Sequence, residues 1–318
     1  MAVTIRLTAD PDTGDGVNYN AGLVSYFSDF TMQGWPYILG GSNAFQGSEI
    51  VLLDDWETDR TETKVAILDG VNFTYYFASH KLTGKLTSIR LSTLGDSYDP
   101  VKESFEQGAN GRITDVTTSI QITGLSISGD AFHKIVAGLM GGVDGGSSVA
   151  NSAPLRAALA SKAQVLQGST GDDTYTGTRF ADKIYGRDGD DTLRGGAGND
   201  KIFGGIGADL LKGNAGRDTV FYNSTADSPL DFNDTILDFR RGQDRIHLAT
   251  IDANELAGGN QAFTFIGAAA FSGTAGELRT EATSGGVFVY GDTDGDKVAD
   301  LAIKINGMAA MVKGDFVL

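Results

Sequence analysis

Apolar and polar residues alternate in two different ways along this chain, and the change comes near residue 145. Before it, apolar residues recur with helical spacing in 18–30 and in 132–140. Four shorter stretches alternate as strands do, and these are 64–68, 73–78, 86–91 and 114–122. The pattern predicts an α+β domain over residues 1–145, a curved antiparallel sheet with helices on one face.

Residues 146–165 are predicted to connect this domain to the rest of the chain. Glycine and serine are frequent in 141–154, which indicates a hinge. The alanine-rich stretch 155–164 that follows predicts a short helix.

From Gly168 the chain adopts a strict period of nine residues. Six consecutive units run from GSTGDDTYT to GNAGRDTVF without a slip in register. The eighth residue of each unit is apolar: Tyr175, Ile184, Leu193, Ile202, Leu211 and Val220. The sixth is always aspartate: Asp173, Asp182, Asp191, Asp200, Asp209 and Asp218. One unit cannot bury its apolar residue alone, so the repeat predicts stacked units, an all-β parallel β-roll over residues 166–222.

The repeat offers the ligands that calcium prefers. Calcium takes six to eight hard oxygen ligands, which a glycine turn supplies as backbone carbonyls beside a carboxylate. The nonapeptide resembles that of the RTX calcium-binding proteins. In their β-roll two units complete one turn, which implies one row of Asp173, Asp191 and Asp209 and a second row of Asp182, Asp200 and Asp218. Phe180 replaces the turn glycine of the second unit, so we expect the Asp182 loop to bind calcium most weakly.

Composition favours cations as partners. The 318 residues suggest about two domains. The formal charge of -16 argues against nucleic acid, which needs a basic face. Cysteine is absent, so neither disulfides nor thiolate metal sites are expected. No apolar run predicts a transmembrane segment, and the N-terminal sequence lacks the features of a cleavable secretory signal, so export is expected to use another address.

The remaining stretch, 223–318, resembles the C-terminal domain of serralysin-type secreted metalloproteases. The resemblance rests on DFNDTILDFRRGQDRIHLATIDANELAGGNQAFTFIG and on FSGTAGELR. It implies a C-terminal β cap and further calcium ligands: Asp238, and the loop residues Asp292, Asp294, Asp296 and Asp300. That loop begins D-x-D-x-D but lacks the bidentate glutamate of a full calcium loop, and a plain acidic turn is the alternative.

The last five residues suggest a route out of the cell. GDFVL resembles the uncleaved C-terminal signal that type I secretion systems read. The resemblance implies an extracellular protein with the type I apparatus as a partner. Such a chain stays unfolded where calcium is scarce and folds where calcium is abundant.

No catalytic motif accompanies the serralysin-like tail. H-E-x-x-H is absent, and His80, His133 and His247 lie far apart in the sequence. A G-x-S-x-G elbow is absent as well. The chain is therefore predicted not to be an enzyme.

The N-terminal domain resembles the haem-acquisition hemophores of the HasA type. The segments that carry the resemblance are AGLVSYFSDF, SHKLTGKLTSI, ITGLSISG and HKIVAGLMGG, in the family's order. The resemblance implies haem contacts at His80, Tyr75, Tyr76, Met32 and Met140. Two ligand schemes follow: Tyr75 or Tyr76 hydrogen-bonded to His80, or His80 itself opposite Met32. A third interpretation is a domain that keeps the fold without the site.

Two functions remain open on the sequence. The first is a secreted calcium-binding RTX protein whose hemophore-like domain captures extracellular haem and passes it to an outer-membrane receptor. The alternative is an extracellular structural, adhesive or self-assembling calcium-dependent module that has lost haem binding.

Overall fold

The structure is a computed structural model, and it describes residues 2–10, 13–32, 36–43, 45–54, 63–79, 81–94, 98–99, 104–114, 116–140 and 150–318. The chain divides into two compact units. The first comprises residues 1–8 and 19–162, and the second comprises 9–18 and 163–318. No helix in the described part of the chain is both long enough and apolar enough to cross a membrane. The division into four parts by residue number stays a prediction.

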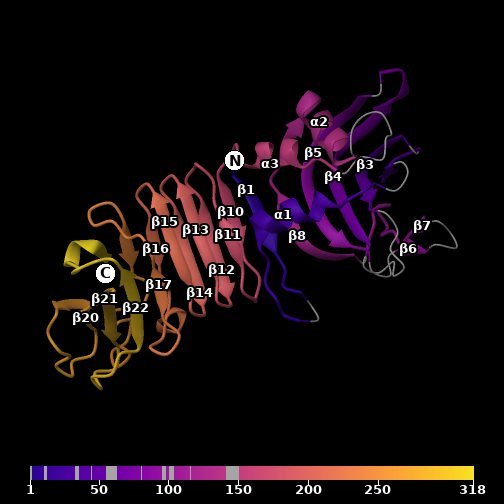
Figure 1. The fold of residues 1–318 in the computed structure, drawn as a ribbon. Coiled ribbons are helices and arrows are strands. Elements are labelled where there is room, and N and C mark those ends of the chain that lie inside the picture. The colour runs from indigo at the N-terminus through magenta and orange to yellow at the C-terminus, as the bar shows by residue number, and fades with distance from the viewer. Residues whose placement is uncertain are drawn as a thin grey trace. The chain divides into compact units, whose positions relative to one another are not determined.

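An antiparallel sheet forms the first unit (Figure 1). Its strands, in spatial order, are β2 (Tyr37–Leu39), β3 (Gln46–Leu53), β4 (Lys64–Tyr76), β5 (Lys81–Thr93), β8 (Thr117–Thr123) and β1 (Val3–Leu7). The short β9 (Ile127–Ser128) pairs with β5, and β6 (Tyr98–Asp99) pairs with β7 (Ser104–Phe105). The stretches 64–68 and 73–78 are thus parts of one strand, β4, which continues through Tyr76 with bulges on the way.

Three α-helices accompany this sheet: α1 (Tyr19–Ser28), α2 (Gly129–Leu139) and α3 (Ala153–Leu159). The helix α2 packs against β5, β9 and α3. It buries Phe132, Ile135, Val136 and Leu139, which recur every three to four residues, so a helix presents them on one face. The predicted helix over 155–164 is wrong at its C-terminal end. It stops at Leu159, and Gln164 begins a strand instead.

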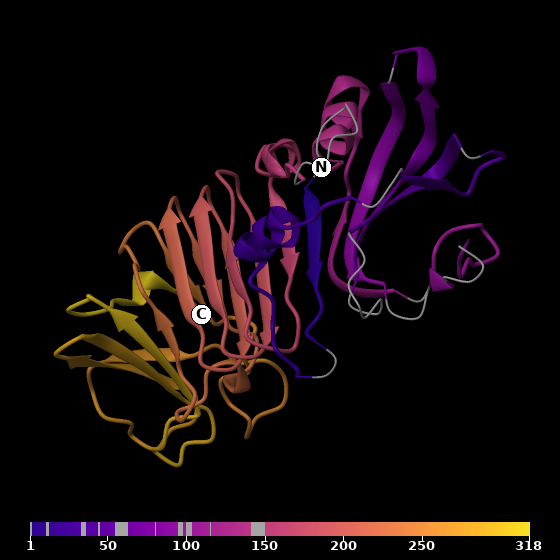
Figure 2. The same cartoon turned by 45° about the vertical axis from the view of Figure 1, so that its right-hand side comes forward.

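The second unit begins as a parallel β-roll, as the repeat predicts, and continues in antiparallel strands over 277–306 (Figures 1 and 2). One sheet consists of β10 (Gln164–Gln167), β12 (Lys183–Asp188), β14 (Lys201–Ile206), β16 (Thr219–Phe221), β18 (Arg245–His247) and β23 (Phe316–Val317). The other begins with β11 (Thr174–Thr176), β13 (Thr192–Ala197), β15 (Leu210–Ala215), β17 (Asp234–Ile236) and β22 (Leu301–Asn306). It ends with β21 (Gly286–Asp292), β20 (Glu277–Thr283) and β19 (Thr264–Gly267). Short 3-10 helices complete the described elements: η2 (Phe77–Ser79) in the first unit, and η4 (Thr225–Asp227) and η5 (Lys313–Asp315) in the second.

The eighth residues of the repeat form the core of the roll. They stack in register, Tyr175 on Leu193 and Leu193 on Leu211 in one sheet, and all six lie buried. The stacking continues beyond the six units. Ile236 follows Leu211, and Ile246 follows Val220. This continuation is not evident from the sequence, because more than 18 residues separate successive turns once the repeat has ended.

An N-terminal arm, residues 13–18, completes the first turn of the roll. The N–H of Val17 donates to Asp173 Oδ1 (2.5 Å), and Val17 O accepts from the N–H of Thr174 (3.1 Å). Within the roll, Asp173 makes the same two bonds with Asp191 and Thr192, its N–H donating to Asp191 Oδ1 (2.7 Å) and its carbonyl accepting from Thr192 N–H (2.8 Å). Val17 therefore stands where a preceding repeat would place its aspartate.

The arm's approach depends on Gly16. A Cβ at this position would overlap the backbone of Asp172, so only glycine lets the two strands approach. We predict that Gly16→Val detaches the arm, and that losing its hydrogen bonds destabilises the first turn by about 1–3 kcal/mol. Hydrogen exchange at the amide of Thr174 measures this. Gly258→Val is the control, since a Cβ at Gly258 meets no atom within 4 Å. Equal exchange in the two variants would contradict the cap.

Candidate calcium sites

The sixth-position aspartates form two hydrogen-bonded ladders along the roll. In each ladder the backbone N–H of one aspartate donates to Oδ1 of the aspartate one turn later. In the first, the donors Asp173, Asp191 and Asp209 reach the acceptors Asp191, Asp209 and Asp234 at 2.7, 2.8 and 2.9 Å. In the second, the donors Asp182, Asp200 and Asp218 reach the acceptors Asp200, Asp218 and Asp244 at 2.8, 2.9 and 3.0 Å. The structure thus brings the predicted residues together in the two predicted rows.

Each ladder bond is accepted by Oδ1 of an aspartate, and Oδ2 takes no part in it. Four of these second oxygens are buried and have no hydrogen-bond partner in the described part of the chain: Oδ2 of Asp191, Asp200, Asp209 and Asp234. A buried carboxylate oxygen without a partner is costly, because it has lost its water and gained nothing in exchange. Such oxygens, beside the backbone carbonyls of glycine turns, are hard ligands that fit calcium.

The first aspartate of each row is different. Asp173 Oδ2 accepts from the N–H of Ser169 (2.6 Å), and Asp182 Oδ2 accepts from the N–H of Thr178 (2.5 Å). The hydroxyls of Ser169 and Thr178 also donate to these carboxylates, at 3.0–3.1 Å. The protein itself therefore occupies both oxygens of these two aspartates. The weak calcium binding expected at Asp182 stays a prediction. Its occupied carboxylate oxygens favour weak binding, and those of Asp173 are occupied in the same way.

Position two of the repeat accounts for this difference. In the four later units this position is Arg187, Gly196, Gly205 or Asn214, and its φ is positive, between 67° and 117°. Ser169 and Thr178 are not among the residues with positive φ. Their N–H groups can therefore turn toward the carboxylate of their own unit. Sequence reasoning considered only the turn glycine at position four, and so it missed this signal.

Position five adds further hydrogen bonds between successive turns at the surface. Asp172 Oδ1 accepts from the N–H of Asp190 (2.7 Å), Asp190 Oδ1 from that of Ala208 (2.8 Å), and Asn199 Oδ1 from that of Arg217 (2.9 Å). These side chains stabilise the loops without being buried. The recurrence of aspartate or asparagine at this position was the available signal.

Asp238, a predicted ligand, has a structural partner for each oxygen. Oδ1 accepts from the N–H of Gly213 (3.0 Å) and Oδ2 from that of Asn214 (2.9 Å). Its carboxylate thereby holds the end of β15. Calcium binding at Asp238 stays a prediction.

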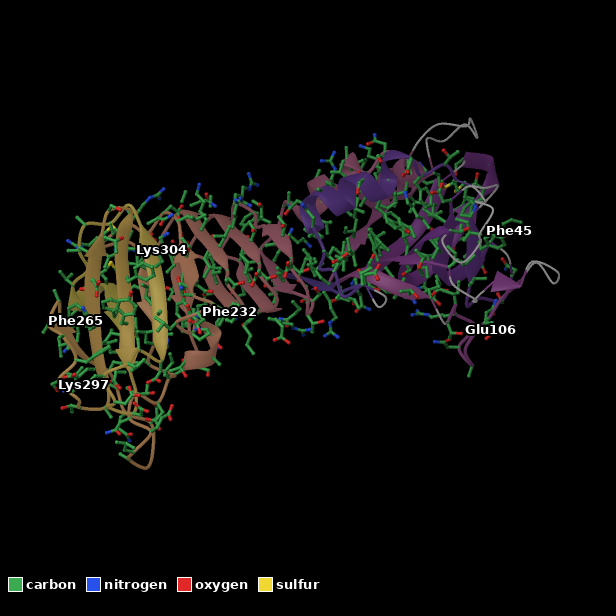
Figure 3. The ribbon with its side chains drawn as sticks, turned by 60° about the horizontal axis from the view of Figure 1, so that its bottom comes forward. Phe45, Glu106, Phe232, Phe265, Lys297 and Lys304 are labelled. Carbon is green, nitrogen blue, oxygen red and sulfur yellow. The ribbon has the colours of Figure 1, made fainter. Side chains whose placement is uncertain are left out.

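The acidic loop of the tail gathers three of its four predicted residues. Ligand oxygens of Asp292, Asp294 and Asp300 lie within 4.8 Å of one another. Asp292 also accepts from the N–H groups of Gly295 (2.6 Å) and Lys297 (3.0 Å), which close the loop labelled by Lys297 in Figure 3. Asp296 lies outside this group, and its side chain accepts from the N–H of Val298 (2.7 Å).

The predicted haem residues lie on separate elements of the first unit. Tyr75 and Tyr76 end β4, Met32 follows α1 and Met140 follows α2. His80 lies outside the described residues. Phe73, the neighbour of these tyrosines, is fully buried and stacks on Phe132 with ring centres 5.0 Å apart. Of the two phenols, that of Tyr76 is the exposed one, at 52%.

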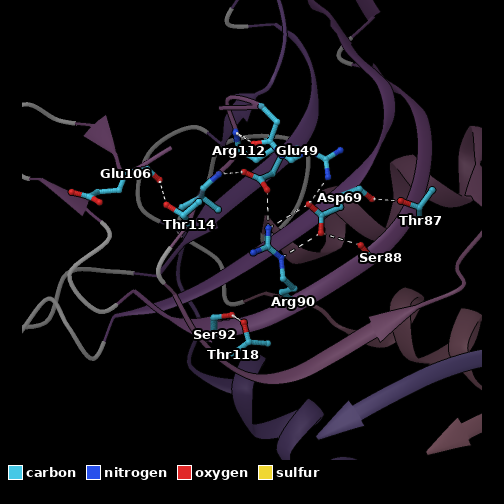
Figure 4. Close-up of polar contacts among 12 residues, drawn as sticks. Glu49, Asp69, Thr87, Ser88, Arg90, Ser92, Glu106, Arg112, Thr114 and Thr118 are labelled. Atoms are coloured by element: carbon cyan, nitrogen blue, oxygen red, sulfur yellow. Dashed lines mark hydrogen bonds and ion pairs between the residues drawn. The ribbon is translucent and has the colours of Figure 1, made fainter. Parts of the chain in front are cut away.

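The first unit buries carboxylates too, but it pairs them (Figure 4). Glu49 Oε2 accepts from Arg90 Nη2 (2.8 Å), and Glu49 Oε1 accepts from the N–H of Ile113 (2.8 Å). Asp69 lies beside Arg90 (3.4 Å) and Arg112 (3.6 Å). Burial raises the pKa of Glu49 to about 7, against the opposing hydrogen bond from Ile113. With its partners in place, this cluster joins neighbouring strands and requires no ion.

Asp191, Asp200 and Asp209 of the roll form no ion pair with a lysine or arginine in the described part of the chain. Burial is the largest cause that raises the pKa of Asp191 to about 8 and those of Asp200 and Asp209 to about 7, and neighbouring aspartates act in the same direction. Burial is the largest cause at Asp234 as well, whose pKa lies well above its ordinary value. Without a cation these groups hold protons at pH values where an unfolded chain has lost them.

The stability of the calcium-free roll should therefore depend on pH. Because the folded pKa values of Asp191, Asp200 and Asp209 lie above the unfolded value, their contribution is full below about pH 4 and is lost as the pH rises through about 7–8. We predict that calcium-stripped protein melts at a higher temperature at pH 6 than at pH 8, measured by far-ultraviolet circular dichroism. With saturating calcium the order should reverse, because protons then compete with the ion. The same order in both conditions would contradict the assignment.

A family model and several solved structures match this chain. The model of the Peptidase M10 serralysin C-terminal family matches residues 136–318. The AlgE6R3 subunit of the mannuronan C5-epimerase from Azotobacter vinelandii is 29% identical, with 48% of this chain and 80% of that chain covered and a TM-score of 0.37. The holo hemophore HasA from Yersinia pestis is 16% identical, with 50% and 89% covered and a TM-score of 0.35. No curated protein matches at a significant level.

Proposed function

We propose, from the premise that the chain belongs to the Peptidase M10 serralysin C-terminal family, that it is a secreted calcium-binding protein whose roll completes its fold on binding the ion. The observation that carries the proposal is the set of buried, unpartnered Oδ2 atoms along the two aspartate ladders. An enzymatic role is not part of the proposal, since the matched family is a C-terminal domain.

Electrostatics supports coupling between the ion and the fold. Asp191 and Asp209 lie one turn apart, and the charge of Asp209 raises the pKa of both Asp191 and Asp234. A divalent cation between successive turns removes this repulsion and supplies the partner that each Oδ2 lacks. Asp191, Asp200 and Asp209 would hold the ion together with backbone carbonyls of the glycine turns. Metal binding would then contribute directly to the free energy of folding.

The tail loop is proposed as a further calcium site. Asp292, Asp294 and Asp300 supply carboxylates that converge within one loop. Thr293 closes it, because its N–H (2.7 Å) and its hydroxyl (2.8 Å) both donate to Asp300 Oδ2. Three carboxylate oxygens within 4.8 Å of one another suit a hard cation.

The proposed route of secretion depends on the difference in calcium concentration between the cytosol and the outside of the cell. Calcium is scarce in the cytosol and abundant outside, so weak, cooperative sites stay empty before export and fill after it. The calcium-free roll, with its carboxylates unpaired, is the unstable form that export of an unfolded chain requires. The type I apparatus is the proposed exporter.

Calcium binding can be tested at one rung of the ladder. Asp191→Asn should remove about one calcium per chain and raise the calcium concentration needed for the gain in β-sheet signal, since an amide is a weaker ligand than a carboxylate. Titration calorimetry gives the first quantity and circular dichroism the second. Asp188→Asn is the matched control, because Asp188 lies exposed on β12. If wild-type protein gives the same spectrum in chelator and in millimolar calcium, the proposal fails.

Haem capture is a second candidate function, for the first unit. The exposure of Tyr76 favours it, because a phenol at the end of a strand is free to reach ferric iron, whereas the buried Phe73 offers no ligand atom. Met32 and Met140 are half-buried and would contact the porphyrin, and Tyr75 and His80 complete the proposed set. A surface receptor would then take the haem from this unit.

Hemin titration separates this candidate from a structural or self-assembling module. We predict a saturable Soret band with one hemin per chain, shifted or lost in Tyr76→Phe because the phenolate ligand is removed. Tyr290→Phe, in the roll unit, is the control. A linear titration in wild-type protein would instead favour the adhesive, self-assembling alternative, for which calcium-triggered oligomers in light scattering are the sign.

A further inference from the structure

In the first aspartate row, the residue next to the carboxylate changes where the repeats end. Position one of every repeat unit is glycine, and a Cβ added at Gly186 or Gly204 would overlap Oδ2 of the aspartate in the same unit. Position one therefore lies next to Oδ2, the carboxylate oxygen that makes no ladder bond. After the sixth unit this position is Tyr222, and its aspartate is Asp234, which lies beyond an inserted loop.

Three buried oxygens without hydrogen-bond partners belong to this place. They are Asp209 Oδ2, Asp234 Oδ2 and the phenolic oxygen of Tyr222, within the described residues. The side chains of Asp209 and Asp234 are adjacent, because the N–H of Asp209 donates to Asp234 Oδ1 (2.9 Å). After burial, Asp234 has the largest effect on the pKa of this phenol and raises it, and the charges of Asp209 and Asp227 act in the same direction. Tyr222 is 1% exposed and both aspartates are fully buried, so water does not compensate them.

Negative charge accumulates at this site in addition to the missing hydrogen bonds. Asp227, from η4, adds a third carboxylate, and its Oδ2 accepts from the N–H groups of Asn223 (2.7 Å) and Ser224 (3.3 Å). None of the three carboxylates forms an ion pair with a lysine or arginine in the described chain.

We infer that Tyr222 contributes its phenolic oxygen to a calcium site with Asp209 and Asp234, and that Asp227 supports this site from the inserted loop. The inference rests on the proposed calcium function and adds a ligand type that the repeat lacks. Hard oxygen donors of this kind, two carboxylates and a neutral hydroxyl, select calcium over softer metals.

This site has a structural consequence. Asp209 precedes β15 and Asp234 begins β17, which pairs in turn with β22 of the C-terminal cap. The inserted loop is tied to the cap as well, because Ser228 Oγ donates to Ala302 O (2.5 Å) and accepts from the N–H of Asp234 (2.8 Å). An ion held here joins the last repeat, the loop and the cap, so its loss should loosen all three together.

Terbium, which occupies calcium sites and emits when a nearby tyrosine is excited, is the probe. In full-length, calcium-stripped protein, Tyr222→Phe should lower tyrosine-sensitised terbium emission by about threefold and weaken one calcium site by about tenfold. Tyr175→Phe is the matched control. Tyr175 is equally buried in the same core, but its hydroxyl donates to Gln164 Oε1 (2.6 Å), beside the aspartates whose oxygens the protein occupies.

Asp227→Asn is a second variant that tests the same site if Tyr222→Phe does not fold. This substitution lies in a partly exposed loop and should weaken the same single site while the other sites titrate as in wild type. Unchanged emission and unchanged calcium affinity in a folded Tyr222→Phe variant would overturn the inference and leave a buried Tyr222–Asp234 hydrogen bond as the role of the phenol. Wild-type protein that binds no calcium would instead overturn the proposed function itself.

Discussion

The backbone-to-carboxylate bond between successive turns is the interaction on which the second unit depends. Each aspartate of the ladder accepts an N–H from the turn before it, so the carboxylate sets the spacing and register of the stacked strands. That bond is made with one oxygen. The other is buried by the same stacking, and at Asp191, Asp200, Asp209 and Asp234 it has no hydrogen-bond partner in the described chain, which is the partner that the proposed cation would supply.

The ends of the ladders show how a roll is closed without a cation. The N–H of Gln164 donates to Asp182 (2.6 Å) as that of Val17 does to Asp173, so both rows begin on a residue that donates but carries no carboxylate. Ser169 and Thr178 then occupy the second oxygen. Hydroxyl and amide donors thus satisfy both carboxylate oxygens of Asp173 and Asp182 within the protein.

Much of the roll could be predicted from the period of nine, because each position in the unit has one physical role. The inward residues and the two aspartate rows follow directly from the repeat. Asp234 and Asp244 continue these rows, but an inserted loop lengthens the spacing, and a search for a constant period does not find them. The arm was invisible for another reason. Val17 and Asp173 are 156 residues apart, and nothing in a local pattern announces a contact over that separation.

The first unit was less predictable because its strands carry no repeat. Its central strands could be located by alternation, yet their register, and with it the charged cluster, depends on pairings between distant segments. Glu49 is as buried as Asp209, but Glu49 meets Arg90, whereas Asp209 meets further carboxylates and a phenol. Under the proposed function, one chain would stabilise buried carboxylates in two ways, with an arginine in the first unit and with an exchangeable ion in the second.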